Sequence, residues 1–110
     1  MYGVSALKAR GITDVYGGYW TCNRLIFAAK EQIRCGVLGD DLHKGLNRYP
    51  AYWESVRSHP GPPIFVVRPD EEALNGAVMR FLQNTGPGYL ALSIDGYTIY
   101  ESAGPANLPD

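Results

Sequence analysis

The chain has 110 residues, of which 45% are hydrophobic and 19% charged, enough for one domain with its own core. Its formal net charge of −1 argues against a nucleic-acid partner, because that function needs a basic face. The sequence shows no signal peptide and no apolar run near the ~20 residues that cross a bilayer, so we expect no transmembrane segment in this chain.

The first third of the chain alternates apolar segments with glycine breaks. Gly11 is suited to end a helix, the Gly17-Gly18 pair closes a strand, and Thr21 is a plausible N-cap. The helix that follows is apolar around much of its circumference, so we expect it to be well covered. These signals predict a helix over 3–10, a strand over 12–16, a helix after Thr21 and a polar edge strand over 32–37.

In the remaining chain, prolines and glycines mark the boundaries. Residues 64–67 form the most apolar run, which fits a strand buried on both faces. Asp95-Gly96 is a preferred two-residue hairpin turn. We expect a loop over 38–48, a helix over 50–59, a strand over 64–67, a helix capped by Asp70, and strands over 89–94 and 97–100.

This element order predicts an α/β fold. Strands that alternate with helices favour a mostly parallel sheet with helices on both faces, here a three-layer α/β/α Rossmann-like domain. Because the first and third strands are the most apolar and the second is polar, we expect about five strands in the order 2-1-3-4-5. The last strand would be antiparallel at the far edge. Residues 1–101 form a single domain in this interpretation, and 102–110 a loose tail.

The segment between the first strand and its helix is the predicted ligand site. In such sheets, ligands bind beyond the carboxyl ends of the strands where the strand order reverses, here between strands 1 and 3. A helix N-terminus at this point favours an anion such as a phosphate. Packing within the domain is the alternative role for the aromatics. The candidate ligand-binding residues are Tyr16, Gly17, Gly18, Tyr19, Trp20, Asn23 and Arg24.

Motifs for catalysis, metals and cofactors are missing from the sequence. The Gly17-Gly18 pair does not match a nucleotide-binding glycine motif, so we expect no cofactor. A thiol enzyme would need a base beside Cys22, and only His43 and His59 are present. Asp40 and Asp41 near His43 fit a solvated loop better than a metal site. Cys22 and Cys35 suit small buried residues, and a disulfide between them stays open, since it depends on compartment and separation.

Residues 7–27 resemble the small C-terminal soluble domain of bacterial membrane glycosyltransferase-like proteins related to protein O-mannosyltransferases. In that family a helix ending in glycine is followed by Tyr-Ala-Asp-Tyr-Trp, a small residue, Tyr-Arg-Leu and Phe. The chain departs where Gly17-Gly18 replaces Ala-Asp and where Asn23 replaces Tyr. Segments 48–56 and 63–66 are also similar to that domain. The matching positions are Gly11, Tyr16, Tyr19, Trp20, Arg24, Leu25 and Phe27.

The resemblance implies a non-catalytic accessory domain on the extracytoplasmic face of the cell membrane, within a longer protein. The family's catalytic acids lie in its membrane part, which would be the partner of this domain. The domain would then contact an acceptor glycan, a lipid-phosphate sugar or a neighbouring module. Two alternatives remain: a free-standing small-ligand-binding protein or thiol enzyme using Cys22, and a pure protein-interaction module.

Overall fold

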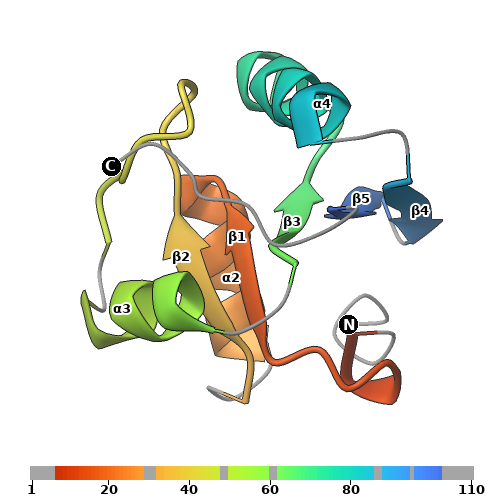
Figure 1. The fold of residues 1–110 in the computed structure, drawn as a ribbon. Helices are drawn as coiled ribbons and strands as arrows, with labels where there is room; N and C mark the ends of the chain where they lie inside the picture. Colours follow the sequence, from red (N-terminus) through yellow and green to blue (C-terminus); the bar gives the residue numbers. More distant parts are fainter. Residues whose placement is uncertain are drawn as a thin grey trace.

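The computed structural model describes residues 7–28, 32–47, 50–59, 62–85, 88–94 and 96–102. The expected helices and strands are found with small shifts at their ends, and α3 begins at Pro50 as the sequence predicts. In chain order they are β1 (Asp14–Gly17), α2 (Tyr19–Ala28), β2 (Arg34–Val37), α3 (Pro50–Ser58), β3 (Ile64–Val67), α4 (Glu72–Thr85), β4 (Leu90–Ile94) and β5 (Tyr97–Glu101) (Figure 1).

The sheet is mixed, with the strand order β2-β1-β3-β5-β4. The two pairings of β1, with β2 and with β3, are parallel. β5 is antiparallel to both of its neighbours, β3 and β4. The expected order 2-1-3-4-5 is therefore wrong. Because two of the four strand pairings are antiparallel, the sheet does not clearly show the expected Rossmann-like, mostly parallel arrangement. The α/β class, the five strands and the antiparallel direction of β5 are confirmed.

Side-chain burial explains why β5 lies inside the sheet and β4 at its edge. β5 buries residues on both faces: Ile99 packs in the core on one side and Tyr100 in the core on the other. β4 is more exposed: Leu90 is 57% exposed, and Ala91 and Ser93 on its other face are exposed as well. Because a central strand must bury both faces, the hairpin folds back with β5 against β3.

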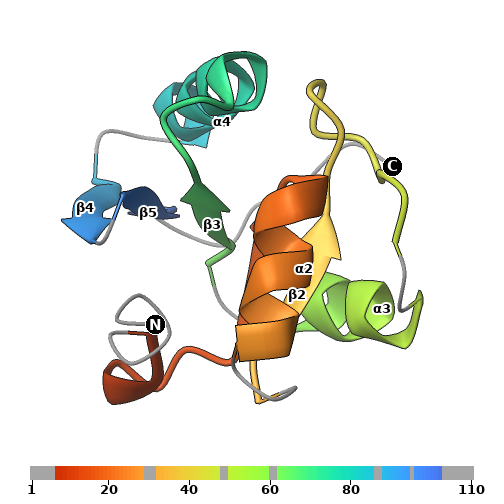
Figure 2. The same cartoon turned by 180° about the vertical axis from the view of Figure 1, so that it is seen from behind.

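Helices cover both faces of the sheet. α2 packs on one face, where Leu25 and Ile26 join the core with Val15. α3 and α4 pack on the opposite face, where Trp53 and Val78 share a second core with other buried residues. Figure 2, turned by 180° from Figure 1, shows α2 in front of the sheet. On the outer side of α2, away from the sheet, the side chains of Trp20 and Phe27 are exposed.

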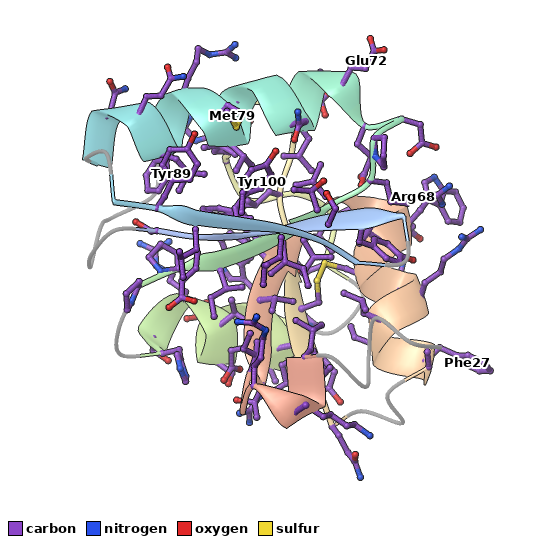
Figure 3. The ribbon with its side chains drawn as sticks, turned by 90° about the vertical axis from the view of Figure 1, so that its right-hand side faces the viewer. Phe27, Arg68, Glu72, Met79, Tyr89 and Tyr100 are labelled. Carbon is purple, nitrogen blue, oxygen red and sulfur yellow. A yellow bond between two sulfur atoms is a disulfide. The ribbon has the colours of Figure 1, made fainter. Side chains whose placement is uncertain are left out.

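Cys22 of α2 and Cys35 of β2 form a disulfide, which settles the question that the sequence left open. Their Cα atoms are 5.2 Å apart, and both side chains are buried in the core beneath α2. The yellow bond in Figure 3 lies between α2 and the sheet. The crosslink fixes α2 to an edge strand, so the helix is attached to the sheet by a covalent bond as well as by apolar contacts.

Glycine ends the first helical turn as the sequence predicts. Gly11 has a φ of 72°, its N–H donates to the carbonyl of Lys8, and the N–H of Ile12 donates to the carbonyl of Leu7. This pair of bonds is the Schellman motif, which favours glycine at its left-handed position. Residues 3–6 of the expected helix over 3–10, Asp95 of the hairpin turn and residues 103–110 of the expected tail lie outside the described residues.

Candidate functional site

The junction between β1 and α2 is closely packed, and its two glycines leave no room for side chains. A Cβ atom on Gly17 would lie 2.9 Å from the backbone carbonyl oxygen of Val66 and 3.5 Å from each disulfide sulfur. A Cβ atom on Gly18 would collide with the carboxylate of Glu71. The predicted glycine break therefore has a structural cause: the backbone of β3 approaches Gly17 directly, and the Glu71 side chain occupies the space beside Gly18.

A carboxylate of the protein itself lies in the crevice where an anion was predicted. Oε1 of Glu71 accepts hydrogen bonds from the hydroxyl of Thr21 (2.8 Å) and the backbone N–H of Arg68 (2.9 Å). Glu71 thus brings a negative charge to the start of α2, where the helix dipole stabilises it. The prediction of an anion site at this helix N-terminus is not supported by this arrangement, because the protein supplies the anion.

The same contacts correct both predicted N-caps. α2 begins at Tyr19, and its first turn is closed by the bond from the Cys22 N–H to the Gly18 carbonyl (2.9 Å), so Thr21 lies within the helix. α4 begins at Glu72, and the N–H of Asn75 bonds to the carbonyl of Glu71 (2.9 Å). Glu71 therefore takes the cap position expected for Asp70.

Replacing Gly17 by alanine should lower the free energy of unfolding by about 1–3 kcal/mol, because the added methyl meets a backbone carbonyl that cannot swing away. Urea unfolding measures the change. Gly76→Ala in α4 is the matched control, since its nearest neighbour is the flexible end of Arg80 and alanine favours a helix by roughly 0.5–1 kcal/mol. Equal and small effects of the two substitutions would contradict the close approach at the junction.

Tyr16, the first predicted ligand residue, points into the core on the side of α3. Its ring stacks on Phe65 at 5.8 Å between centroids and meets the edge of Trp53 at 5.8 Å. Only 6% of the residue is exposed. Burial raises the pKa of the Tyr16 hydroxyl, while the nearby charge of Arg57 acts in the opposite direction. Tyr16 is therefore a packing residue, separated by the sheet from the aromatics that follow it.

The raised pKa of Tyr16 predicts a loss of stability in alkali. The unfolded chain ionises near the ordinary tyrosine pKa of 10.0, whereas the folded chain resists ionisation there. The stabilising contribution is thus complete below pH 10 and is lost as the pH rises through the folded pKa. Urea midpoints measured at neutral pH and above pH 10 should show this fall, and Tyr16→Phe should reduce it. An identical fall in that variant would assign the effect to other groups.

The remaining predicted side chains lie on or beside the open side of α2. Trp20 is 73% exposed, and Phe27, two turns further along, is 87% exposed, with Arg24 between them at helical spacing. We call Trp20, Arg24 and Phe27 the α2 outer face. Tyr19 is half-buried and supports the Trp20 ring in an edge contact at 4.9 Å. In Figure 3, Phe27 points away from the sheet.

This exposure corrects the expectation that α2 is well covered. Its buried residues are Thr21, Cys22, Leu25 and Ile26, which cover only the side that faces the sheet. Asn23, the last of the predicted site residues, is half-buried on α2. Its Oδ1 atom is buried and has no hydrogen-bond partner within the described part of the chain. The structure thus keeps Tyr19, Trp20 and Arg24 together at the surface and separates Tyr16 from them.

The thiol-enzyme alternative does not fit this geometry. Cys22 is fully buried and its sulfur is bonded to Cys35, so it offers no nucleophile in this state.

Within the described ranges, no three His, Cys, Asp or Glu side chains are grouped to hold a metal ion. No helix there is long and apolar enough to span a bilayer.

A buried polar cluster at the opposite end of the sheet was not predicted. The side chain of Asp14, at the start of β1, is only 2% exposed and lies 3.0 Å from Nδ1 of His59 and 2.8 Å from Nε of Arg34. Its oxygens also accept hydrogen bonds from the hydroxyls of Thr13 (2.9 Å) and Ser55 (3.1 Å). The sequence signal was an acid inside an apolar strand, which must find partners when it is buried.

Comparisons with known proteins add no relative to this description. The chain matches no family model, no curated protein and no solved structure.

Proposed function

We propose that this chain is a non-catalytic, extracytoplasmic accessory domain of a membrane-bound glycosyltransferase-like protein. Its α2 outer face, with Tyr19, contacts an acceptor glycan or lipid-linked sugar of the parent enzyme. The observation that carries the proposal is the exposure of Trp20, at 73%, on a helix whose opposite side is fixed to the sheet. An exposed indole ring on a fixed helix offers a flat apolar surface to a ligand. Binding to it costs little conformational entropy of the side chain.

Two further observations support the proposal. Disulfides persist in oxidising compartments and are rare in the cytosol, so the Cys22–Cys35 bond agrees with a site outside the cytoplasm. Arg24 lies one helical turn from Trp20 and offers a planar donor group to hydroxyl or phosphate oxygens. The resemblance in residues 7–27 matches this chain at Tyr19, Trp20 and Arg24, the same residues that reach the surface.

A chemical-shift titration of the oxidised domain tests the glycan contact. Short neutral glycans and sugar phosphates should shift the signals of Tyr19, Trp20 and Arg24, and Trp20→Ala should remove these shifts. Leu90→Ala is the matched control, because Leu90 is a large apolar side chain exposed at 57% on the edge strand β4. If no glycan or sugar phosphate perturbs α2, the glycan contact is rejected.

A protein contact is the second candidate function, and Phe27 favours it. A phenyl ring exposed at 87% has no polar edge to serve a sugar, and aromatic residues are enriched in the centre of protein interfaces. In this case the α2 outer face would bind a neighbouring module or a second copy. Sedimentation over a range of concentrations separates the two cases: self-association that Phe27→Ala abolishes would favour the interaction module, and a persistent monomer would exclude pairing of copies.

A further inference from the structure

The two edges of the sheet differ in how their backbone groups are satisfied. At the β2 edge, the segment that follows the strand folds back and bonds to it. The N–H of Val37 donates to Oδ1 of Asn47 (2.8 Å). The carbonyl of Val37 accepts from the N–H of Gly45 (2.8 Å) and from Nδ2 of Asn47 (3.3 Å). These bonds occupy backbone groups that another strand would need, so the β2 edge is closed at Val37.

β4 forms the other edge, and its pairing with β5 determines which of its backbone groups point outward (Figure 1). The N–H of Ser102 donates to the carbonyl of Pro63 (3.1 Å), so the even-numbered residues of β5 bond to β3 and the odd-numbered ones to β4. Leu92 pairs with an odd-numbered residue and therefore bonds to β5. Its neighbours Ala91 and Ser93 direct their N–H and C=O groups away from the sheet.

The β4 edge lacks the features that usually prevent a sheet from pairing with another chain. Within the part of the chain that the structure describes, neither Ala91 nor Ser93 has a hydrogen bond on its outward side, and both residues are exposed. Sheet edges are commonly protected by a charged residue, a proline or a bulge. β4, with the sequence Leu-Ala-Leu-Ser-Ile, has neither charge nor proline, and its pairing with β5 runs through consecutive residues without a bulge.

A second copy of this chain is the occupant that β4 fits best. In an antiparallel pair of two β4 strands centred on Leu92, the outward groups of Ala91 meet those of Ser93 in the other copy, and this contact forms twice. A strand that pairs with itself must avoid meeting its own charge, and β4 is uncharged, so it also offers no charge to a foreign strand. Leu92 would lie opposite its own copy, with Leu90, which is 57% exposed, diagonally beside it.

We propose that β4 pairs antiparallel with β4 of a second copy, so that two five-stranded sheets become one continuous sheet. The assembly ends at two copies, because both domains use the same edge and the β2 edge is closed at Val37. An interface of two short strands is small and is typical of a weak complex. α2 packs on β1 and β2, in the other half of the sheet, so the proposal does not depend on the glycan contact.

Sedimentation of the oxidised domain, from micromolar to about millimolar concentration, should show a dimer that grows with concentration. Two matched double substitutions test the register. Ala91→Lys with Ser93→Lys sets like charges opposite each other in both bonded pairs and should raise the dissociation constant of the dimer about tenfold. Ala91→Lys with Ser93→Glu sets opposite charges in the same pairs and should leave the dimer as tight as before or tighter. Circular dichroism confirms that both variants are folded.

Amide hydrogen exchange locates the contact. The N–H groups of Ala91 and Ser93 should exchange more slowly as the concentration rises, because they gain partners only in the dimer. The N–H of Leu92, which already bonds to β5, should change less. Phe27→Ala should leave the dimer intact, which separates this contact from self-association through the α2 outer face.

Two results would overturn the proposal. The first is a monomer at about millimolar concentration with unprotected edge amides, which would leave the edge to a strand of a different protein. The second is equal weakening by both double variants, or association that only Phe27→Ala abolishes. The glycan contact is judged separately, since it is read at Trp20 and in the monomer as well as in the dimer.

Discussion

Replacing Tyr16 by alanine is expected to lower the free energy of unfolding by about 3–5 kcal/mol, as for other large aromatics removed from a core. The ring of Tyr16 fills space between Phe65 and Trp53, with both ring centroids at 5.8 Å, and only 6% of the residue is exposed. Alanine would leave a cavity on the face of the sheet that α3 and α4 cover. Urea unfolding should show a lower midpoint with an unchanged slope.

Two controls separate packing from ligand contact in this experiment. Tyr16→Phe keeps the ring and should recover most of the stability, because only the hydroxyl is lost. Trp20→Ala should change the free energy of unfolding by no more than about 0.5 kcal/mol, as is usual for exposed positions. If Trp20→Ala destabilised the domain as much as Tyr16→Ala, the division of the junction into a buried and an exposed half would be wrong.

Removing the disulfide should have the second large effect, a loss of about 3 kcal/mol. The bond joins cysteines 13 residues apart, and a closed loop of that size restricts the unfolded chain by roughly this amount in the chain-entropy treatment. Cys22→Ala with Cys35→Ala is the suitable variant, because both sites are apolar and buried. The variant loses stability because its unfolded chain is less restricted and because α2 is no longer bonded to β2.

A reductant provides the matched measurement. Unfolding of the unchanged chain in urea should shift to a lower midpoint when a reductant is present, while the double alanine variant should unfold at the same midpoint with and without it. A thiol assay in denaturant should detect no free thiol in the unchanged chain, whose two cysteines are paired. Insensitivity of the unchanged chain to the reductant would contradict the stabilising role of the bond.

Local signals in the sequence were sufficient for most elements. Apolar residues between breakers located β3, Pro50 located the start of α3, and Gly11 marked a helix end. The order of β4 and β5 was not predicted, because sequence proximity suggested that β4 would follow β3. The sequence does carry a signal for the observed order of β4 and β5. Residues 97–100 place large apolar groups on both faces of their strand, whereas Ser93 leaves one face of β4 polar.

The site was predicted less well because its contacts are distant in sequence. Thr21 meets Glu71 across 50 residues, and no local pattern reveals that this carboxylate occupies the crevice. Ser55 and Asp14 are 41 residues apart, so the cluster around Asp14 was equally hidden. Trp20 was placed correctly at the junction, but only the structure distinguishes its exposure from the burial of Tyr16. The apolar run after Thr21 suggested a well-covered helix, although the sheet covers only one side of α2 and Phe27 is exposed.

We propose that Trp20 contacts a ligand, whereas the core behind it serves stability alone. The indole N–H signals of the two tryptophans test it most directly, since Trp20 is 73% exposed and Trp53 is 3% exposed. In a titration with short neutral glycans, we expect a saturable shift of the Trp20 indole signal and an unmoved Trp53 signal. An unmoved Trp20 signal at saturating glycan, or equal shifts of both signals, would contradict it.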